Sequence, residues 1–281
     1  MVRVRSYLRR RGRRTMGGQE SPITRKEFGI EKARQIESRT GMALVSVGRK
    51  KAIIKSDYGR ALRESVVDTI DDLLDWNVVP PTTAILLSPT GKEPSWHPLW
   101  NKNKPQTVSI QEWIENAVPF YTWSKDKPQT VNRLIIFGHL IKENSKNELR
   151  LWRIAALDAI INNIDRHDGN IVINKKTGLV WAIDNGLSFE YDCRPSGNRI
   201  IEWASDSGGI LPSPVLHDLR ALDEGDLRAA LSPLPFQEIE DAIKRWKNLK
   251  KAGSIQDVWP GLPVARSRNI GCWEPLNRHP T

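Results

Sequence analysis

Short apolar runs separated by turn residues fill the first third of the chain, and this pattern is typical of β-strands. The runs cover residues 33–38, 42–47, 51–55 and 83–87. Before the last run, apolar residues recur at the spacing of an amphipathic helix, at Val66, Val67, Ile70, Leu73 and Leu74. Asn77 and the proline pair at positions 80 and 81 would end this helix. The pattern predicts a β-rich region that contains one helix.

A polar stretch rich in proline and lysine, residues 88–108, follows this region and predicts a loop. Another strand is predicted at residues 109–114. Helical spacing dominates from residue 132 onward. The predicted helices cover residues 147–161, 214–230 and 236–251. After the first of them come a polar loop at residues 162–170 and a strand–turn–strand over residues 171–183, which predicts a hairpin.

The order of these elements indicates two lobes. Strands come first and helices later, with one hairpin between them, which predicts an α+β protein with a β-rich N-lobe and a mainly helical C-lobe. A length of 281 residues is sufficient for two such lobes. We expect four segments. They are a basic arm over residues 1–26, the N-lobe over residues 27–116, the C-lobe over residues 117–263 and a loose tail over residues 264–281.

The net charge of +10 is concentrated in the amino-terminal arm. Seven arginines and no acidic residue lie among the first fourteen residues: Arg3, Arg5, Arg9, Arg10, Arg11, Arg13 and Arg14. The rest of the chain carries only +3, the difference between +10 and the +7 of the arm. Such an arm can bind polyanions, including nucleic acid, through counterion release, or it can be a solvated segment that aids solubility or targeting. Both interpretations stay open.

The same sequence indicates the cellular compartment. No stretch approaches eighteen uncharged apolar residues, so we expect no membrane span. The arginines near the amino terminus are not followed by an apolar segment, so we do not expect a secretory signal. Cys193 and Cys272 are the only cysteines, and two cysteines provide neither a disulfide framework nor a zinc site. We therefore expect a cytoplasmic protein.

The strongest chemical pattern lies in two loops that the predicted hairpin connects. Residues 162–170 read Asn-Asn-Ile-Asp-Arg-His-Asp-Gly-Asn, and residues 183–186 read Ile-Asp-Asn-Gly. Phosphoryl transfer from ATP needs a carboxylate that orients the attacking hydroxyl and oxygen ligands that hold Mg²⁺. Asp165 and Asn170 have the five-residue interval of the aspartate and asparagine in the protein-kinase catalytic loop. We therefore predict a catalytic Asp165, with Asn170 and Asp184 as metal ligands.

A kinase also needs a strand lysine that holds the ATP phosphates and a helix glutamate that fixes this lysine. Lys55 ends the run Ala-Ile-Ile-Lys, in the manner of the Val-Ala-Ile-Lys pattern of kinases, and Glu64 lies near the start of the following helix. We predict that both bind ATP. Each pattern also has a simpler interpretation: a solvated strand end for Lys55, a favourable helix amino terminus for Glu64, and turn chemistry for the loop of Asp165. Their order along the chain favours the site.

Three further residues are predicted to contact ATP. The turn at residues 38–41 contains small residues, and Gly41 would approach the phosphates. The strand at residues 109–114 would lead to the connection between the lobes, so that its backbone, at Gln111 and Trp113, would meet adenine. An ordinary strand is the alternative interpretation.

The run at residues 165–170 resembles the Asp-Arg-His-x-x-Asn catalytic loop of phosphatidylinositol 3- and 4-kinases, and Asp184 takes the place of the aspartate in their Asp-Phe-Gly motif. A closer resemblance is to small bacterial or phage-type proteins of that superfamily. Their motifs match at Arg63-Glu64, Val-Pro-Pro-Thr (79–82), Asn-Asn-Ile-Asp-Arg (162–166) and Ile-Asp-Asn-Gly-Leu-Ser-Phe (183–189). The resemblance spans residues 41–253 and implies a two-lobed kinase-like fold, ATP and Mg²⁺. It also implies that His167 acts in catalysis, as a proton shuttle or a phosphate contact.

Three functions remain open at this point. The first is an active ATP- and Mg²⁺-dependent kinase. The second is a nucleotide-binding pseudokinase or scaffold, and the third is a nucleic-acid-associated protein that acts through the arginine arm. For a kinase, we favour a Ser/Thr hydroxyl of a protein over a lipid as the phosphate acceptor. The reason is that the chain lacks the accessory lipid-binding domains of large lipid kinases and has the size of compact bacterial protein kinases.

Overall fold

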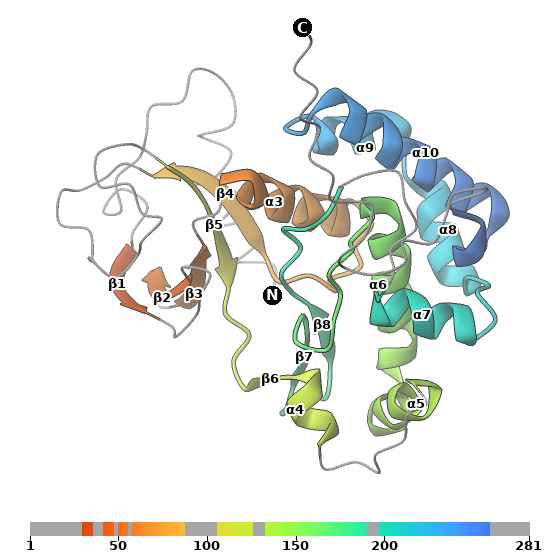
Figure 1. Cartoon of the computed structure of the whole chain (residues 1–281), viewed down its shortest axis with the longest axis horizontal. Coiled ribbons are helices and arrows are strands. Elements are labelled where there is room, and N and C mark those ends of the chain that lie inside the picture. The colour runs from red at the N-terminus through yellow and green to blue at the C-terminus, as the bar shows by residue number, and fades with distance from the viewer. Residues whose placement is uncertain are drawn as a thin grey trace, which may run out of the picture. The chain divides into compact units, whose positions relative to one another are not determined.

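The computed structural model of the protein describes residues 30–35, 42–47, 50–55, 58–87, 106–125, 133–189 and 197–258. The chain divides into two compact units (Figure 1). The first unit consists of Met1–Asp72, Val79–Glu115 and the short segment Asp184–Gly186. The second consists of Leu73–Val78, Asn116–Ile183 and Leu187–Thr281. The arginine-rich arm at residues 3–14 and both cysteines lie outside the described residues.

The first unit contains a five-stranded antiparallel sheet with the strand order β1-β2-β3-β5-β4. Its strands are β1 (Ile30–Gln35), β2 (Met42–Val47), β3 (Lys50–Lys55), β4 (Thr82–Leu87) and β5 (Gln106–Glu112). Buried and half-buried residues alternate along β2, which shows that one face of the sheet is covered. The buried side chains of the sheet form one cluster: Ala43, Val45, Val47, Ala52, Ile54, Ile85, Val108 and Ile110.

Helix α3 (Tyr58–Leu73) follows β3 directly and belongs to the same part of the chain. Its apolar residues Val66, Val67 and Ile70 are buried, as their spacing predicts. The predicted stop is also confirmed, because β4 begins only after the proline pair at positions 80 and 81. The short connection between β3 and α3 fixes the end of the strand close to the first turns of the helix.

Two strands begin three residues earlier than predicted. Strand β5 begins at Gln106, although residues 88–108 were predicted to be a loop. Gln106 and Thr107 pair with Leu87 and Leu86 of β4, so backbone pairing with an existing strand decides the structure of these polar residues. Strand β1 begins at Ile30, three residues before the predicted start.

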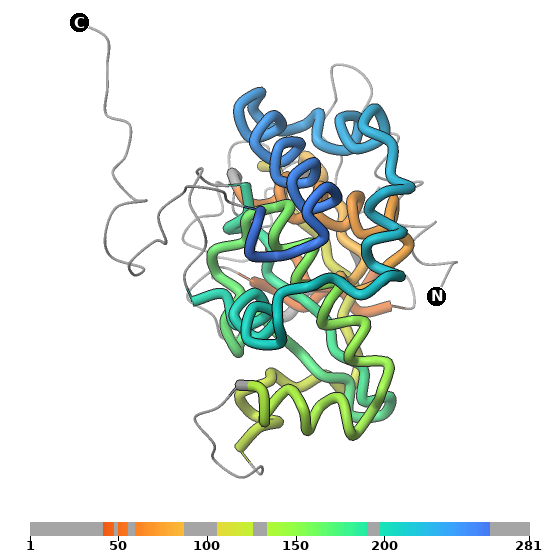
Figure 2. The backbone as a smooth tube through the Cα atoms, turned by 90° about the vertical axis from the view of Figure 1, so that its right-hand side faces the viewer, coloured from red at the N-terminus to blue at the C-terminus, as the bar shows by residue number. Residues whose placement is uncertain are grey.

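The second unit is mainly helical. Its longer helices are α5 (Arg133–Glu143), α6 (Lys146–Ile161), α7 (Arg199–Asp206), α8 (Ser213–Ala221), α9 (Glu224–Leu231) and α10 (Phe236–Ala252). The shorter elements are α4 (Phe120–Ser124), η1 (Ile255–Val258) and a sheet of β6 (Ala117–Pro119), β7 (Ile171–Asn174) and β8 (Val180–Ala182). Helices α7 and α10 pack against α6 (Figure 2), whose residues are buried for most of its length.

The predicted helix at residues 214–230 is two helices, which is a correction. Leu222 is extended between α8 and α9, and the side chain of Asp223 accepts hydrogen bonds from the backbone N–H groups of Gly225 and Asp226. An aspartate at this position satisfies N–H groups that a new helix leaves without partners. A local hydrogen bond therefore starts a second helix where the apolar spacing alone indicates one continuous helix.

Other sequence predictions are confirmed in this unit. Helix α6 matches the predicted segment at residues 147–161, and β7 and β8 form the predicted hairpin. An antiparallel sheet in the first unit and helices in the second confirm the α+β class.

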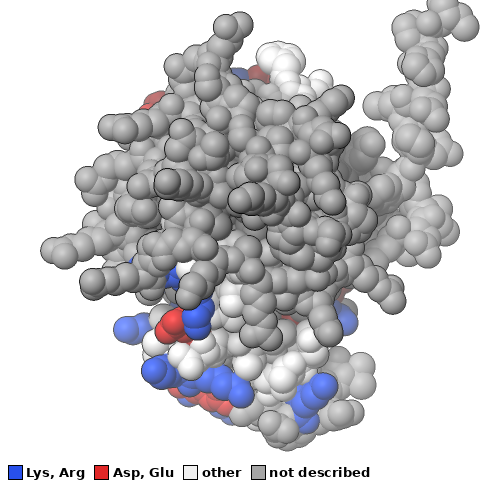
Figure 3. Space-filling model, turned by 90° about the vertical axis from the view of Figure 1, so that its left-hand side faces the viewer, with Lys and Arg blue, Asp and Glu red and all other residues white. Residues whose placement is uncertain are grey.

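Among the described residues, none of the helices is long and apolar enough to cross a membrane. On the described part of one face, basic side chains lie beside acidic ones (Figure 3).

Candidate active site

Lys55 and Glu64 form a buried ion pair within the first unit. Lys55 is the last residue of β3, and its Nζ lies 2.5 Å from Oε1 of Glu64 on α3. The Lys55 side chain is 12% exposed and that of Glu64 only 2%. Ser109 lies directly opposite Lys55 in the β3–β5 register, and its hydroxyl donates to Oε2 of Glu64 at 2.5 Å. Both carboxylate oxygens of Glu64 therefore have a donor.

Asp184 joins this pair. Its Oδ1 lies 3.1 Å from Nζ of Lys55, and its side chain is 48% exposed. The backbone of Asp184 has a φ of 56°, in the left-handed region that non-glycine residues rarely adopt. Asp is among the residues that tolerate this region, and such conformations cluster at functional sites. The structure thus brings together three of the residues that the sequence singled out: Lys55, Glu64 and Asp184.

The charges in this cluster depend on one another. Burial lowers the pKa of Lys55, but the carboxylates of Glu64 and Asp184 raise it more, so the pKa lies above its ordinary value and Lys55 is an ammonium ion. Burial and the neighbouring carboxylate of Asp184 raise the pKa of Glu64 above its ordinary value, although Lys55 and the hydrogen bond from Ser109 oppose this rise. Both partners of Glu64 therefore favour its ionised form, and Lys55 does so through its charge.

This coupling predicts how pH affects a Lys55→Met variant. Without the ammonium ion the pKa of Glu64 rises further above its unfolded value, so folding stability is retained below about pH 4.3 and is lost as pH rises through the folded pKa. We expect the variant to be less stable than the wild type by about 1–3 kcal/mol at pH 8 and by clearly less at pH 5. Urea unfolding at both pH values measures this difference.

Lys51 provides the matched control for that experiment, because it lies on the same strand with an exposed side chain. A Lys51→Met variant should have the same stability difference from the wild type at both pH values. A Lys55→Met variant that also shows a pH-independent difference would contradict the coupling of Glu64 to Lys55.

A small cavity lies beside the cluster. Its volume is about 40 Å³, which exceeds the roughly 10–15 Å³ that one water molecule requires. Its wall consists of Met42, Lys55, Arg60, Ala61, Glu64, Ser109 and Asp184. The cavity can therefore accept a small polar group next to the ammonium ion of Lys55.

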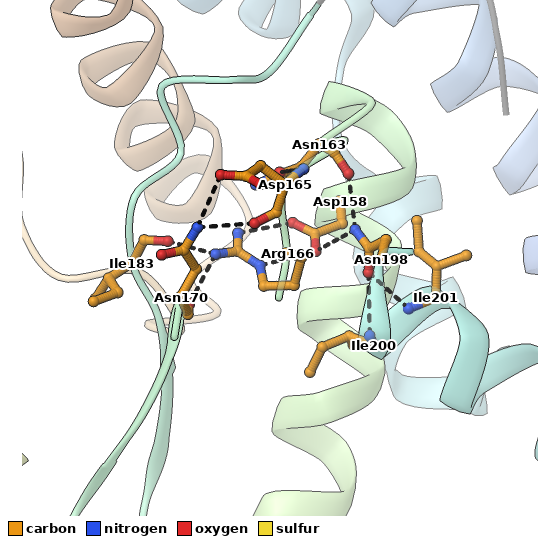
Figure 4. Close-up of polar contacts among 9 residues, drawn as sticks. All are labelled: Asp158, Asn163, Asp165, Arg166, Asn170, Ile183, Asn198, Ile200 and Ile201. Carbon is orange, nitrogen blue, oxygen red and sulfur yellow. Dashed lines mark hydrogen bonds and ion pairs between the residues drawn. The ribbon is translucent and has the colours of Figure 1, made fainter. Parts of the chain in front are cut away.

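Asp165 and Asn170 contact each other in the second unit (Figure 4). Nδ2 of Asn170 donates to the backbone oxygen of Asp165 at 2.8 Å and to its carboxylate at 3.3 Å. The backbone N–H of Asp165 donates to Oδ1 of Asn163 at 2.9 Å. The two predicted residues are thus held in one loop by hydrogen bonds that involve the backbone, which fixes their relative position.

The buried side chain of Arg166 holds this loop in place through hydrogen bonds (Figure 4). Its Nε and Nη2 donate to the two carboxylate oxygens of Asp158 on α6, each at 3.0 Å, and both side chains are fully buried. This paired geometry is the strongest arrangement that an arginine makes with a carboxylate. Nη1 donates to the backbone oxygens of Asn170 at 3.0 Å and Ile183 at 2.5 Å. Arg166 therefore connects α6 to Asn170, which precedes the β7–β8 hairpin, and to Ile183, which follows the hairpin. Ile183 is the residue directly before Asp184.

Asn198 links the Asp158–Arg166 pair to the start of α7. Its Nδ2 donates to Asp158 Oδ2 at 3.0 Å and to the backbone oxygen of Asn163 at 2.9 Å, while its Oδ1 accepts from the N–H groups of Ile200 and Ile201 (Figure 4). The same side chain thus starts a helix and holds the loop. Asn198 was not among the residues predicted from the sequence, although an asparagine before an apolar helical run is a recognisable start signal.

His167 lies at the surface of this loop. Its Nδ1 accepts a hydrogen bond from the backbone N–H of Gly169 at 2.9 Å, and its Nε2 lies 3.9 Å from Oδ2 of Asp165. A Cβ atom at position 169 would lie 2.7 Å from Cε1 of His167, so only glycine allows the ring to lie there. The ring is 41% exposed, which leaves it accessible to a substrate.

Two of the remaining predicted residues, Gln111 and Trp113, lie in or beside the sheet. Gln111 is buried, and its Nε2 donates to the hydroxyl of Thr82 at 3.0 Å. The backbone N–H of Trp113 donates to the backbone oxygen of Lys51 at 3.0 Å. Gly41 lies outside the described residues. The adenine contacts of Gln111 and Trp113 and the phosphate contact of Gly41 therefore stay predictions.

The part of the chain that contains the loops of Asp165 and Asp184 matches a known protein family. Residues 149–264 match the family described as phosphatidylinositol 3- and 4-kinase. This part of the chain is therefore similar to that family, and the fold of the chain is kinase-like. The matched residues of this kinase-like chain include Asp158, Asp165, Asn170 and Asp184. No curated protein sequence matches the chain.

Solved structures show the same kinase-like fold. Hydra Fam20 with sugar superimposes with a TM-score of 0.56 and 15% identity, over 82% of this chain and 85% of its own. The Golgi casein kinase gives a TM-score of 0.55 and 16% identity, over 84% of this chain and 73% of its own. The Golgi casein kinase with Mn/ADP bound gives 0.54 and 16%, over 86% and 77%. This likeness confirms the two-lobed α+β kinase fold. Because the identities are so low, it shows the fold alone.

Proposed function

We propose that the protein is an ATP- and Mg²⁺-dependent kinase that phosphorylates a Ser or Thr hydroxyl of a protein. The buried Lys55–Glu64 pair, with Asp184 at 3.1 Å from the lysine, carries this proposal. Kinases require a lysine that is held by a glutamate for the ATP phosphates and an aspartate that binds the metal. A buried ion pair costs desolvation energy and is weak support for stability, so its presence favours a functional role.

Asn170 and Asp184 suit a hard divalent cation. Mg²⁺ binds carboxylate and carbonyl oxygens. Asp184 offers a half-exposed carboxylate. In both hydrogen bonds of the Asn170 side chain the donor is Nδ2, which leaves the amide oxygen for a cation. Ile183 donates its backbone N–H to the oxygen of Asn170 at 3.0 Å, and Asp184 is the next residue in the chain. Bound metal and ATP would supply the phosphoryl group and neutralise its charge.

Asp165 would act on the acceptor. Its carboxylate is 25% exposed and is held by the loop, so it can accept a hydrogen bond from a hydroxyl and orient it. His167, whose Nε2 lies 3.9 Å from that carboxylate, would contact the transferred phosphate or relay the proton. A protein acceptor is favoured because one protein that shares this fold is named a casein kinase.

Metal-dependent nucleotide binding tests the ligand assignment. We expect the wild type to bind ATP much more weakly in EDTA than in Mg²⁺, because the metal links Asp184 and Asn170 to the phosphates. Asp184→Ala and Asn170→Ala should each abolish this difference. Calorimetric titration with ATP under both conditions measures it, and the thermal unfolding of each variant controls for misfolding. Equal affinity of the wild type in EDTA and in Mg²⁺ would contradict the assignment.

Transfer of labelled phosphate tests the activity itself. The purified protein is incubated with labelled ATP and Mg²⁺, alone and with a protein extract or phosphatidylinositol vesicles. Label in protein supports a protein kinase, whereas label only in lipid would contradict the proposed acceptor. ATP binding without any transfer would indicate a pseudokinase.

A further inference from the structure

A second basic side chain lines the cavity beside Lys55. Arg60 lies in the first turn of α3, one helical turn before Glu64, and both side chains form part of the cavity wall. Residues four apart on a helix share one face. The helix that holds Lys55 through Glu64 therefore also presents an arginine to the same space.

Gly186 shows that this position of Arg60 is built into the fold. A Cβ atom at position 186 would lie 2.7 Å from Cβ of Arg60 and 3.2 Å from its Cγ and Cδ. The nearest atom is the fixed Cβ, so a different rotamer of Arg60 cannot relieve the contact. Glycine thus lets the segment that carries Asp184 lie against the aliphatic part of Arg60.

The charge balance of the cavity gives Arg60 a role. Glu64 and Asp184 both lie within about one hydrogen-bond length of Nζ of Lys55, so two carboxylates already face a single ammonium ion. Mg-ATP that enters beside them still carries net negative charge, so a cation in addition to Lys55 and the proposed Mg²⁺ would stabilise it. Among the described residues of the cavity wall, Arg60 is the other cation. Its guanidinium stays charged at any physiological pH and forms paired hydrogen bonds with phosphate oxygens.

We propose that Arg60 binds the phosphates of the nucleoside triphosphate, next to Lys55. This inference rests on the proposed function and adds to it a phosphate-binding residue that the motifs do not contain. Gly186 serves the same purpose indirectly, because it permits the close approach of Arg60 to the segment of Asp184.

Binding measurements with shortened ligands test this role. Mg-ATP, Mg-ADP and adenosine are titrated into the full-length wild type and into Arg60→Gln and Arg60→Lys variants. Loss of one charged phosphate contact should weaken ATP binding roughly ten- to hundredfold, and adenosine affinity should stay unchanged. Arg60→Lys keeps the charge but loses the paired geometry, so we expect an intermediate loss.

Arg63 provides the matched control. It is a partly exposed arginine on the same helix and is absent from the cavity wall, so Arg63→Gln should bind all three ligands like the wild type. Thermal unfolding checks that each variant is folded. If Arg60→Gln does not fold, the ATP affinity of Arg60→Lys decides the test. If both folded Arg60 variants bind ATP as tightly as the wild type, this inference is overturned and the proposed function is not. A wild type that binds no ATP would overturn the proposed function together with it.

Discussion

Replacing Asp165 by alanine is expected to lower phosphate transfer by about 10²–10⁴-fold, the range for a group that positions and deprotonates a nucleophile. Mg-ATP affinity should change little, because the proposed phosphate and metal contacts at Lys55, Asn170 and Asp184 remain. The transfer rate with labelled ATP and the affinity by titration are measured on the same preparation. This separation of rate from affinity identifies a catalytic group.

The structure also limits what Asp165 can contribute to stability. Its backbone N–H and backbone oxygen are bonded to Asn163 and Asn170, and both bonds are retained in the alanine variant. We therefore expect a loss within the range of about 0.5–2 kcal/mol that is typical of a capping side chain. Asp168 lies in the same loop, 38% exposed and 3.5 Å from Arg199, and Asp168→Ala is the matched control with unchanged transfer. Unchanged turnover in Asp165→Ala would remove this residue from the mechanism.

Local sequence patterns predicted the elements that carry the candidate site. The apolar spacing of α6 and the strand–turn–strand of β7 and β8 were predicted correctly, because each depends on residues close together in the chain. The single helix predicted at residues 214–230 was wrong for a reason that is also local, a hydrogen bond that the apolar spacing does not reveal. There the side chain of Asp223, a single capping residue, divides the apolar periodicity into two helices.

Contacts between distant residues could not be predicted in this way. Ser109 lies 45 residues from Glu64, and only the register of β5 against β3 places its hydroxyl on the carboxylate. Asn198 lies 40 residues from Asp158. Asp158 does carry a signal, because an acidic residue within the apolar pattern of α6 must find a buried partner. The sequence indicates that such a partner exists, but not that it is Arg166.

The Asp158–Arg166 pair should have the largest effect on folding. Asp158→Ala leaves the fully buried guanidinium of Arg166 without its carboxylate. Loss of one partner of a buried pair costs about 3–5 kcal/mol, because the remaining charge stays buried. This is a large part of the 5–15 kcal/mol by which proteins are stable. Urea unfolding should show the loss, and an Asp168→Ala variant, which removes an exposed carboxylate from Arg199, should lose much less.

A double variant separates the structural part of this pair from its functional part. Asp158→Leu combined with Arg166→Met removes both charges, and apolar replacement of a buried pair is often neutral for stability. The double variant should therefore regain most of the stability that Asp158→Ala loses. It still lacks the bonds from Arg166 to the backbone oxygens of Asn170 and Ile183, which hold the loop of Asp165 and the residue before Asp184. Phosphate transfer should stay low in the stable double variant, and full transfer there would show that Arg166 only stabilises the fold.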